Sequence, residues 1–319
     1  MRRCSVGLLI LMAMAALAPA LAQEKTEKLT FSQAYRGKTI TVGGDLLLPP
    51  GSAKVPALVI HHGSGGVSES REWRYAREIL KMGVATFVID SFTPRGITST
   101  VKDQSTVTAN DMLFDDFAAL KALANHPRID AQHIGIVGFS KGGTSALTAA
   151  NEGRASRALP PGLRYALHVP FYPSCGSQYY KPKTTGAPIY LLLGAADTYV
   201  GTAPCQEYVA ALKAEGARIE LTLYPNAKHG FDGNAAYTVP DGENYSRCVF
   251  AQQPDGTWKE RVSGITTFGV NGQIFEAEYK KALGVCRTHG VSGGPDAEAK
   301  AKSMAALKSY VQQHLLDGK

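Results

Sequence analysis

Short apolar runs alternate along the chain with stretches in which apolar residues recur every three or four positions. Continuous apolar runs bounded by turn residues are typical of strands buried on both faces of a sheet, and we expect them at residues 56–61, 84–90, 134–137, 165–171 and 188–194. Alternating patterns predict further strands at 38–48 and 218–224, and we expect an edge strand at 28–31. Apolar residues at helical spacing predict helices at 70–82, 107–125, 144–150, 202–215 and 296–316. Such alternation implies a mostly parallel sheet with helices on both faces.

The pattern weakens over residues 232–294, between the last predicted strand and the closing helix. Loops longer than about 15 residues without secondary structure are uncommon unless they serve a function. Turn signals at Asp255-Gly256 and Ser263-Gly264 predict a hairpin within residues 249–268. The segment also carries aromatic residues, which argue against a disordered tail: Tyr237, Tyr245, Phe250, Trp258, Phe268, Phe275 and Tyr279. We therefore expect a single domain over 23–319 with an insertion at about 232–294.

The stretch Gly-Phe-Ser-Lys-Gly at 138–142 joins a predicted strand directly to a predicted helix. Strand, sharp turn and helix form the setting of a nucleophile elbow, in which the turn lifts a serine hydroxyl off the sheet. Glycines two residues before and after the serine avoid a clash where the strand folds back against the helix. The pattern recurs around Ser292, but no strand-like run precedes that copy and Pro295 follows it, so we expect a flexible loop there. We therefore interpret Ser140 as the nucleophile.

A serine hydroxyl needs a base to accept its proton, and the base needs a carboxylate to fix its tautomer. Asp197 lies just past one predicted buried strand, and His229 lies just past the last predicted strand. The order Ser, Asp, His is that of α/β-hydrolases. Because ligands bind beyond the carboxyl ends of parallel strands, we predict a triad of Ser140, His229 and Asp197.

Ester hydrolysis also needs backbone N–H groups that bind the developing oxyanion. We expect one from Lys141, directly after the nucleophile, and one from Ser64 in the glycine-rich loop that follows residues 56–61. The side chain of Lys141 is given no catalytic role. Three other histidines are interpreted as structural: His61, His62 and His168.

The first 22 residues have the composition of a secretory signal peptide. Arg2 and Arg3 are basic, residues 6–17 are apolar, and Ala20-Leu21-Ala22 is a small-residue cleavage site. The apolar run is too short for a membrane span, and no later stretch replaces it. We expect an exported protein, periplasmic or secreted after cleavage near Ala22, with no stable membrane insertion.

The charge balance does not favour a nucleic-acid partner. Loss of Arg2 and Arg3 with the leader would lower the formal net charge from +7 to +5, and the remaining basic residues are scattered. Scattered charge is typical of a solvated surface. The sequence has neither a zinc-type cysteine spacing nor a His-Glu-x-x-His motif, so we expect no metal site.

Four cysteines follow the leader, and an even number in an exported chain predicts two disulfides. Cys175 follows the strand predicted at 165–171, and Cys205 lies eight residues past Asp197. Because the ends of adjacent strands bring their loops together, we predict a Cys175–Cys205 bond. Cys248 and Cys286 would then pair and staple the segment 232–294.

Five motifs occur in order: His-Gly-Ser-Gly-Gly at 62–66, Asp-Ser-Phe-Thr-Pro-Arg-Gly at 90–96, Gly-Phe-Ser-Lys-Gly-Gly at 138–143, Gly-Ala-Ala-Asp at 194–197 and Lys-His-Gly-Phe at 228–231. With them, residues 55–231 and the closing helix resemble the dienelactone hydrolase family of α/β-hydrolases. The resemblance implies an α/β-hydrolase fold with an eight-stranded sheet. It also implies hydrolysis of a small carboxylic ester or lactone without a cofactor.

The chain departs from this family in two ways. The namesake enzymes have a cysteine where this chain has Ser140, which favours a general esterase. About sixty residues separate His229 from the final helix, whereas the family's histidine is usually followed soon by that helix.

We interpret the chain as an exported serine ester hydrolase that works through an acyl-enzyme. A serine peptidase of the same fold, or a non-catalytic binding protein on a hydrolase scaffold, are the alternatives. The oligomeric state stays open. Residues 232–294 form either a flap that limits which acyl or alcohol group enters, or a surface decoration away from the pocket.

Overall fold

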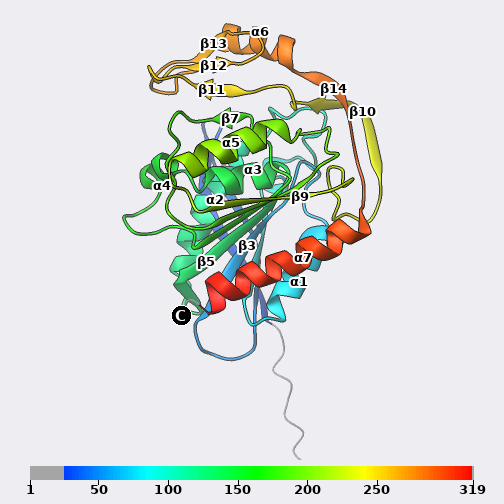
Figure 1. Cartoon of the computed structure of the whole chain (residues 1–319). Helices are drawn as coiled ribbons and strands as arrows, with labels where there is room; N and C mark the ends of the chain where they lie inside the picture. The colour runs from blue at the N-terminus through cyan, green and yellow to red at the C-terminus, as the bar shows by residue number, and fades with distance from the viewer. Residues whose placement is uncertain (1–24, 318–319) are drawn as a thin grey trace, which may run out of the picture.

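One large, mostly parallel sheet forms the centre of the molecule (Figure 1). The structure is a computed structural model that describes residues 25–317, so the expected leader at 1–22 lies outside the described residues. Within them, only β1 with β2 and β2 with β4 pair antiparallel in this sheet, and all its other neighbours are parallel. The eight strands lie in the order β1 (Lys25–Tyr35), β2 (Lys38–Leu48), β4 (Ala85–Asp90), β3 (Val55–His61), β5 (Ile129–Phe139), β6 (Leu167–Phe171), β8 (Ile189–Gly194) and β9 (Ile219–Tyr224).

Helices cover both faces of this sheet. Two of them, α1 (Arg74–Leu80) and α7 (Ala297–Val311), lie together on one face (Figure 1). The other face carries α2 (Ala109–Ala124), α3 (Lys141–Thr148) and α5 (Ala203–Ala214). Shorter helical pieces are η1 (Glu69–Trp73), η2 (Thr93–Arg95), α4 (Glu152–Ala158) and η3 (Gln312–Leu316). This arrangement is the α/β-hydrolase fold, which confirms the fold class expected from the sequence.

Apolar side chains pack the helices onto the sheet. Tyr75 of α1 and Leu307 of α7 belong to one fully buried cluster, and Phe117 and Leu120 of α2 belong to another. At the start of α2, Thr108 and Asp111 form a reciprocal capping box that satisfies the first N–H groups of the helix. The core therefore fixes the strands, and with them the loops at their carboxyl ends.

Residues 237–293 lie outside the main sheet, across the top and down the right side of the view in Figure 1. A ribbon of two antiparallel strands, β10 (Tyr237–Asn244) and β14 (Thr288–Gly293), connects it to the main body. Beyond the ribbon lie helix α6 (Glu276–Cys286) and a four-stranded sheet of β13 (Thr266–Phe268), β12 (Trp258–Glu260), β11 (Phe250–Gln252) and β7 (Ser177–Gln178). We call this part of the chain the 237–293 segment.

The loop expected around Ser292 is wrong. Ser292 lies in β14 and pairs with Thr238 of β10. β14 is stabilised by pairing with β10, about fifty residues earlier in the chain. A local sequence pattern does not predict such a contact. The motif around Ser292 is therefore part of a ribbon, with no strand-to-helix elbow.

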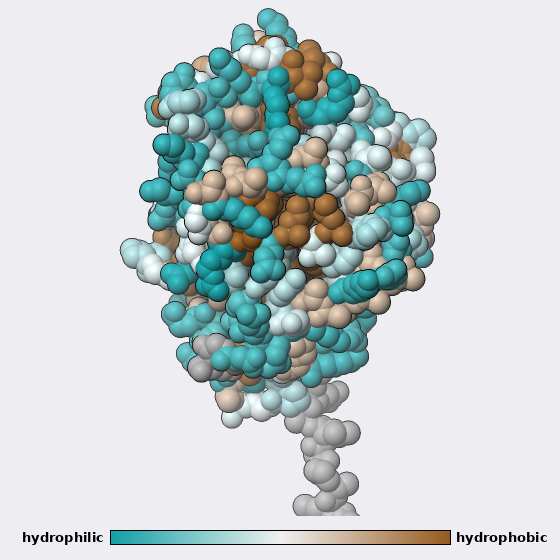
Figure 2. Space-filling model, in the orientation of Figure 1, coloured by the Kyte–Doolittle hydropathy of each residue, from teal (hydrophilic) through white to brown (hydrophobic). Residues whose placement is uncertain are grey.

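The described surface is mostly hydrophilic on the face shown in Figure 2, with hydrophobic groups at the top, over the 237–293 segment, and near the middle. The exposed apolar side chains of that segment are Val262, Val270, Ile274 and Val285. Between residues 25 and 317, none of the helices combines the length and the apolar character that crossing a bilayer requires.

Candidate active site

The turn between β5 and α3 holds Ser140 in a strained backbone conformation, with φ 54° and ψ −113°. Residues other than glycine rarely adopt a positive φ, and such strain gathers at functional sites. A Cβ atom on Gly138 would lie 2.0 Å from the carbonyl oxygen of Gly142, and one on Gly142 would lie 2.4 Å from that of His62. Both glycines are thus required where the strand, the helix and the neighbouring loop meet.

The three predicted triad side chains lie together in the structure. The Oγ atom of Ser140 lies 2.8 Å from Nε2 of His229, and Nδ1 of His229 lies 2.7 Å from Oδ2 of Asp197. His229 is 3% exposed and Asp197 is 5% exposed, so the hydrogen bonds are largely shielded from water. With Nδ1–H donating to Asp197, Nε2 is free to accept the serine proton.

The carboxylate of Asp197 is held in its charged form. Burial by itself would raise the pKa of Asp197, but the neighbouring His229 and the N–H groups of Tyr199 and Val200 together hold this pKa below its usual value. Those N–H groups donate to Oδ1 at 2.9 and 3.1 Å, which leaves Oδ2 for the histidine. The acid is therefore oriented by the loop that carries it, residues 195–200, which we call the acid loop.

Two tyrosine rings pack against the imidazole of His229. The ring centroid of Tyr199 lies 4.6 Å from that of His229, and the centroid of Tyr172 lies 4.8 Å away. The hydroxyl of Tyr172 donates to Oδ1 of Asp232 at 2.6 Å, which fixes the ring. These contacts restrict rotation of the imidazole, and no motif in the sequence predicted them.

The glycine-rich loop after β3, residues 62–66, lies against Ser140, and we call it the oxyanion loop after the role predicted for Ser64. A Cβ atom on Gly63 would lie 3.2 Å from Cβ of Ser140. The carbonyl oxygen of Ser64 accepts hydrogen bonds from the N–H of Thr100 at 2.9 Å and the hydroxyl of Ser99 at 3.0 Å. Ser64 is therefore buried on a loop that contacts Ser140 and is held in place by Ser99 and Thr100.

The ammonium group of Lys141 binds the segment that supports the oxyanion loop. It donates to Oγ1 of Thr100 at 2.8 Å, to the carbonyl of Gln104 at 3.1 Å and to that of Val107 at 2.5 Å. Burial lowers the pKa of Lys141 to about 7, against the charges of Asp111, Glu243 and Asp103. The side chain thus anchors a loop, and its backbone N–H begins helix α3.

A second Ser-His-Asp arrangement lies inside the protein. The Nε2 atom of His61 is 2.9 Å from Oγ of Ser91, and its Nδ1 atom is 2.6 Å from Oδ1 of Asp116. All three residues are 0% exposed, and the hydroxyl of Ser91 donates to Oδ2 of Asp115 at 2.5 Å. Because Ser91 is fully buried, no substrate reaches it, and its hydroxyl donates to Asp115 instead of to the histidine. The arrangement is therefore structural.

The Asp-Ser-Phe-Thr-Pro-Arg-Gly motif at 90–96 is scaffold as well. Arg95 binds both carboxylate oxygens of Asp115, at 2.8 and 3.0 Å. Oδ1 of Asp90 accepts from the N–H groups of Phe92 and Thr93 and so caps the turn. The motif fixes the loop after β4 to helix α2.

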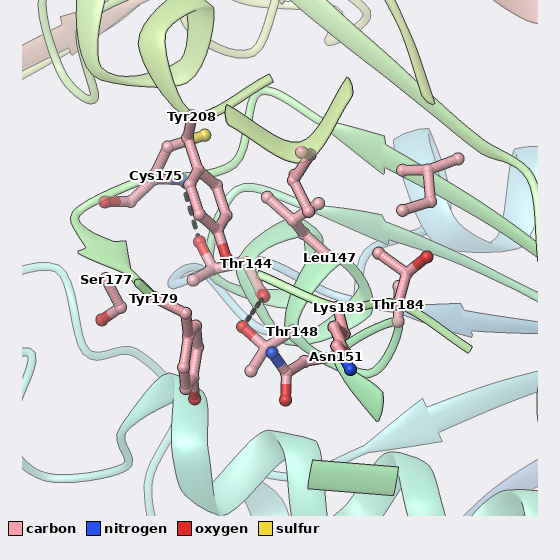
Figure 3. A pocket seen from close by; sticks show the side chains of 14 residues that line it. Thr144, Leu147, Thr148, Asn151, Cys175, Ser177, Tyr179, Lys183, Thr184 and Tyr208 are labelled. Atoms are coloured by element: carbon pink, nitrogen blue, oxygen red, sulfur yellow. Dashed lines mark hydrogen bonds between the residues drawn. The ribbon is translucent and has the colours of Figure 1, made fainter. Parts of the chain in front are cut away.

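The four cysteines form two disulfides, Cys175 with Cys205 and Cys248 with Cys286. The first bond borders a pocket between α3 and α5, whose labelled lining residues include Thr144, Leu147 and Tyr208 (Figure 3). The triad residues are not among the described residues that line this pocket. Within residues 25–317 we find no cluster of three or more His, Cys, Asp or Glu side chains suited to a metal ion.

A sequence profile of the dienelactone hydrolase family matches residues 43–247, well over half of the chain. The chain belongs to the dienelactone hydrolase family. It is therefore a carboxylic ester hydrolase, as the motifs predicted.

The chain is also similar in sequence to two individual proteins. A protein from Bradyrhizobium sp. described as a probable 2-oxo-3-(5-oxofuran-2-ylidene)propanoate lactonase is 26% identical over 205 residues, which cover 58% of this chain and 77% of the relative. An uncharacterised protein of Pseudomonas aeruginosa is 29% identical over 152 residues, which cover 47% of this chain but only 39% of that protein.

Solved structures share the fold at low sequence identity. A dienelactone hydrolase-like promiscuous phosphotriesterase from metagenomic libraries superposes with a TM-score of 0.54 at 17% identity, covering 91% of this chain and 98% of that one. An esterase of Thermogutta terrifontis with bound propionate gives a TM-score of 0.50 at 16% identity, covering 68% and 88%.

Proposed function

We propose that this protein hydrolyses carboxylic esters or lactones with Ser140 as nucleophile, His229 as base and Asp197 as the orienting acid. The observation that carries this proposal is the hydrogen-bond chain of 2.8 and 2.7 Å through the imidazole, which starts at a serine in a strained elbow. The family supplies the reaction class, and the geometry of the three side chains supports the roles that we propose for them.

The proposed reaction has two half-reactions. Oγ of Ser140 attacks the ester carbonyl carbon while its proton passes to Nε2 of His229, and the carbonyl π pair moves to the oxygen. In this proposal the backbone N–H groups of Lys141 and Ser64 bind that oxyanion. The C–O bond then breaks, the alcohol leaves with the proton from His229, and water releases the acid from the acyl-enzyme by the same route.

We also propose lactones among the substrates, since a lactone is a cyclic ester and the Bradyrhizobium relative is described as a lactonase. With a lactone the alcohol produced by ring opening stays attached to the acyl group. The same residues serve both substrate classes.

Export is part of the proposal. Disulfides persist in oxidising compartments, and the bonds Cys175–Cys205 and Cys248–Cys286 support a periplasmic or secreted location after cleavage near Ala22. We propose residues 23–319 as one domain with an insertion at about 232–294, which contains the 237–293 segment. The N–H of Gly294 donates to the carbonyl of His229 at 3.0 Å, so the segment returns directly to the triad.

A fluorophosphonate probe tests the assignment of the nucleophile. The probe should label the protein at a single site, and the loss of activity should be proportional to the labelling. Peptide mapping should find the label on the peptide that contains Ser140. Labelling elsewhere with Ser140 unmodified would contradict the proposal.

A further inference from the structure

In the loop at residues 97–107, Gln104 forms hydrogen bonds through both polar groups of its side chain and through its backbone N–H and carbonyl. The hydroxyl of Ser64 donates to Oε1 of Gln104 at 3.1 Å, and Nε2 of Gln104 donates to the hydroxyl of Tyr199 at 3.0 Å. Its backbone N–H donates to Oε2 of Glu243 at 2.7 Å, and its carbonyl accepts from the ammonium of Lys141 at 3.1 Å. Gln104 thus joins four separate parts of the chain.

Two of these partners belong to the two loops that contact the proposed triad. Ser64 lies in the oxyanion loop beside the nucleophile, and Tyr199 lies in the acid loop with its ring 4.6 Å from the ring of His229. The side-chain amide of Gln104 therefore connects the oxyanion loop to the acid loop. A side-chain amide is suited to this because it offers a donor and an acceptor at one fixed spacing.

The other side of Gln104 is fixed by the 237–293 segment. Glu243 of β10 is 6% exposed, and its Oε2 atom also accepts from the hydroxyl of Tyr245 at 3.2 Å. The other carboxylate oxygen of Glu243 pairs with Arg287, the residue directly after Cys286 of the second disulfide. The N–H of Glu243 donates to the carbonyl of Val101 at 2.9 Å.

We propose that Gln104 is a positioning residue that holds the oxyanion loop and the acid loop in register, and that Glu243 of the 237–293 segment sets its position. This proposal rests on the proposed ester hydrolase function. The segment then acts on catalysis through a partly buried series of contacts, from the disulfide through Arg287 and Glu243 to Gln104.

The contact of Gln104 with Ser64 predicts which kinetic constants should change. A shift of the Ser64 N–H weakens oxyanion binding, which counts in the transition state far more than in the ground state. Gln104 has no role in proton transfer, so its loss should lower kcat and leave KM nearly unchanged.

We suggest measuring kcat and KM for 4-nitrophenyl acetate in Gln104→Ala, Glu243→Ala and Glu243→Gln. In Gln104→Ala and Glu243→Ala we expect kcat to fall about ten-fold or more, with KM within about two-fold of wild type. Glu243→Gln keeps an oxygen that accepts the N–H of Gln104, so we expect kcat within about three-fold of wild type. Asp241→Asn is the matched control, because Asp241 joins the same two segments through an exposed ion pair to Lys102 at 2.7 Å.

The outcomes separate this proposal from the proposed function. Wild-type kcat in a folded Gln104→Ala protein would overturn it, as would equal losses in Glu243→Gln and Glu243→Ala. A loss of kcat in Asp241→Asn as large as in Glu243→Ala would also overturn it. If Ser140→Ala hydrolyses the ester as fast as wild type, the proposed function fails; if Ser140→Ala is inactive and Gln104→Ala is not, only this inference fails. Denaturant unfolding of each variant, with the fraction of active sites titrated by the fluorophosphonate, corrects kcat for unfolded protein.

Discussion

Two buried histidines, His61 and His229, have the same kinds of neighbour, a serine on one ring nitrogen and an aspartate on the other. They differ in what surrounds the serine. Ser91 is fully buried and gives its proton to Asp115, whereas Ser140 sits half-buried in the elbow with its hydroxyl directed to the imidazole. At the scale of single residues, two properties therefore separate the proposed catalytic serine from the structural one. Ser140 is partly exposed, and its hydroxyl is available to donate to the histidine, whereas the hydroxyl of Ser91 is buried and donates to a carboxylate.

Asp197→Asn should lower kcat for ester hydrolysis by about 10⁴-fold, because the amide favours the wrong imidazole tautomer. Asp232 is the carboxylate nearest to His229 in sequence, but it accepts a hydrogen bond from Tyr172 and pairs with Arg71 at 3.3 Å. Steady-state kinetics of the folded variant provide the measurement. A loss smaller than ten-fold would exclude Asp197 as the acid.

His168 in β6 predicts a loss of stability in acid. Burial lowers the pKa of His168 from 6.5 to about 4, against a hydrogen bond to the carbonyl of Ala146 at 2.9 Å. Because the unfolded chain then binds the proton first, this stability is present above pH 6.5 and is lost as the pH falls towards 4. Relative to His168→Asn, the wild-type free energy of unfolding should fall by roughly 3 kcal/mol over that interval. Urea titrations at several pH values measure this difference, and parallel curves for the two proteins would refute the prediction.

At the scale of elements, Gly63 sets how closely the oxyanion loop approaches the end of β5. A Cβ atom on Gly63 would lie 3.0 Å from the carbonyl of Phe139, whereas one on Gly65 has no neighbour within 4 Å. Gly63→Ala should therefore displace the loop and lower kcat by about 10²-fold, the effect of losing one oxyanion donor. Gly65→Ala is the control and should retain wild-type kcat. Equal activities in the two variants would show that the loop is not positioned by this contact.

The elements of the main sheet were predictable because each carries its own pattern. β2 has the predicted bounds, and the apolar runs of β3, β4 and β8 are buried as expected. The β11–β12–β13 meander turns near the Asp255-Gly256 and Ser263-Gly264 signals. In contrast, β10 and β14 pair with each other over about fifty residues, and α4 buries only Ala155, so neither left a local signal.

The site was predictable to the same extent. Ser140, Asp197 and His229 each follow a parallel strand of the main sheet, and parallel strands bring such positions to one edge. Gln104 and Glu243 lie in a loop and a non-local ribbon, where residue type carries no motif. Their place became visible only with the contacts of the folded chain.

At the scale of the whole molecule, the 237–293 segment has a core of its own, in which Phe250, Tyr279 and Ala282 pack around the disulfide of Cys248 and Cys286. Asn244 also donates to the carbonyl of Thr198 in the acid loop at 3.1 Å. The segment is therefore supported internally and contacts the site through its ribbon.

Removing the Cys248–Cys286 disulfide tests whether the 237–293 segment affects which esters the enzyme prefers. The bond closes a loop with a sequence separation of 38, and in the chain-entropy model its loss should cost about 3–4 kcal/mol of stability. In the Cys248→Ser/Cys286→Ser protein we expect a changed ratio of kcat/KM between short and long acyl esters. An unchanged ratio in a folded double variant would reduce the segment to surface decoration.

The central claim is that Ser140 is the nucleophile of an ester hydrolase, and the chain supplies its own control in the second copy of the motif. Hydrolysis of 4-nitrophenyl acetate should be measured for wild type, Ser140→Ala and Ser292→Ala under the same conditions. We expect Ser140→Ala to lose at least about 10⁴-fold in kcat, and Ser292→Ala to match wild type. An active Ser140→Ala enzyme, or an inactive but folded Ser292→Ala enzyme, would contradict the account.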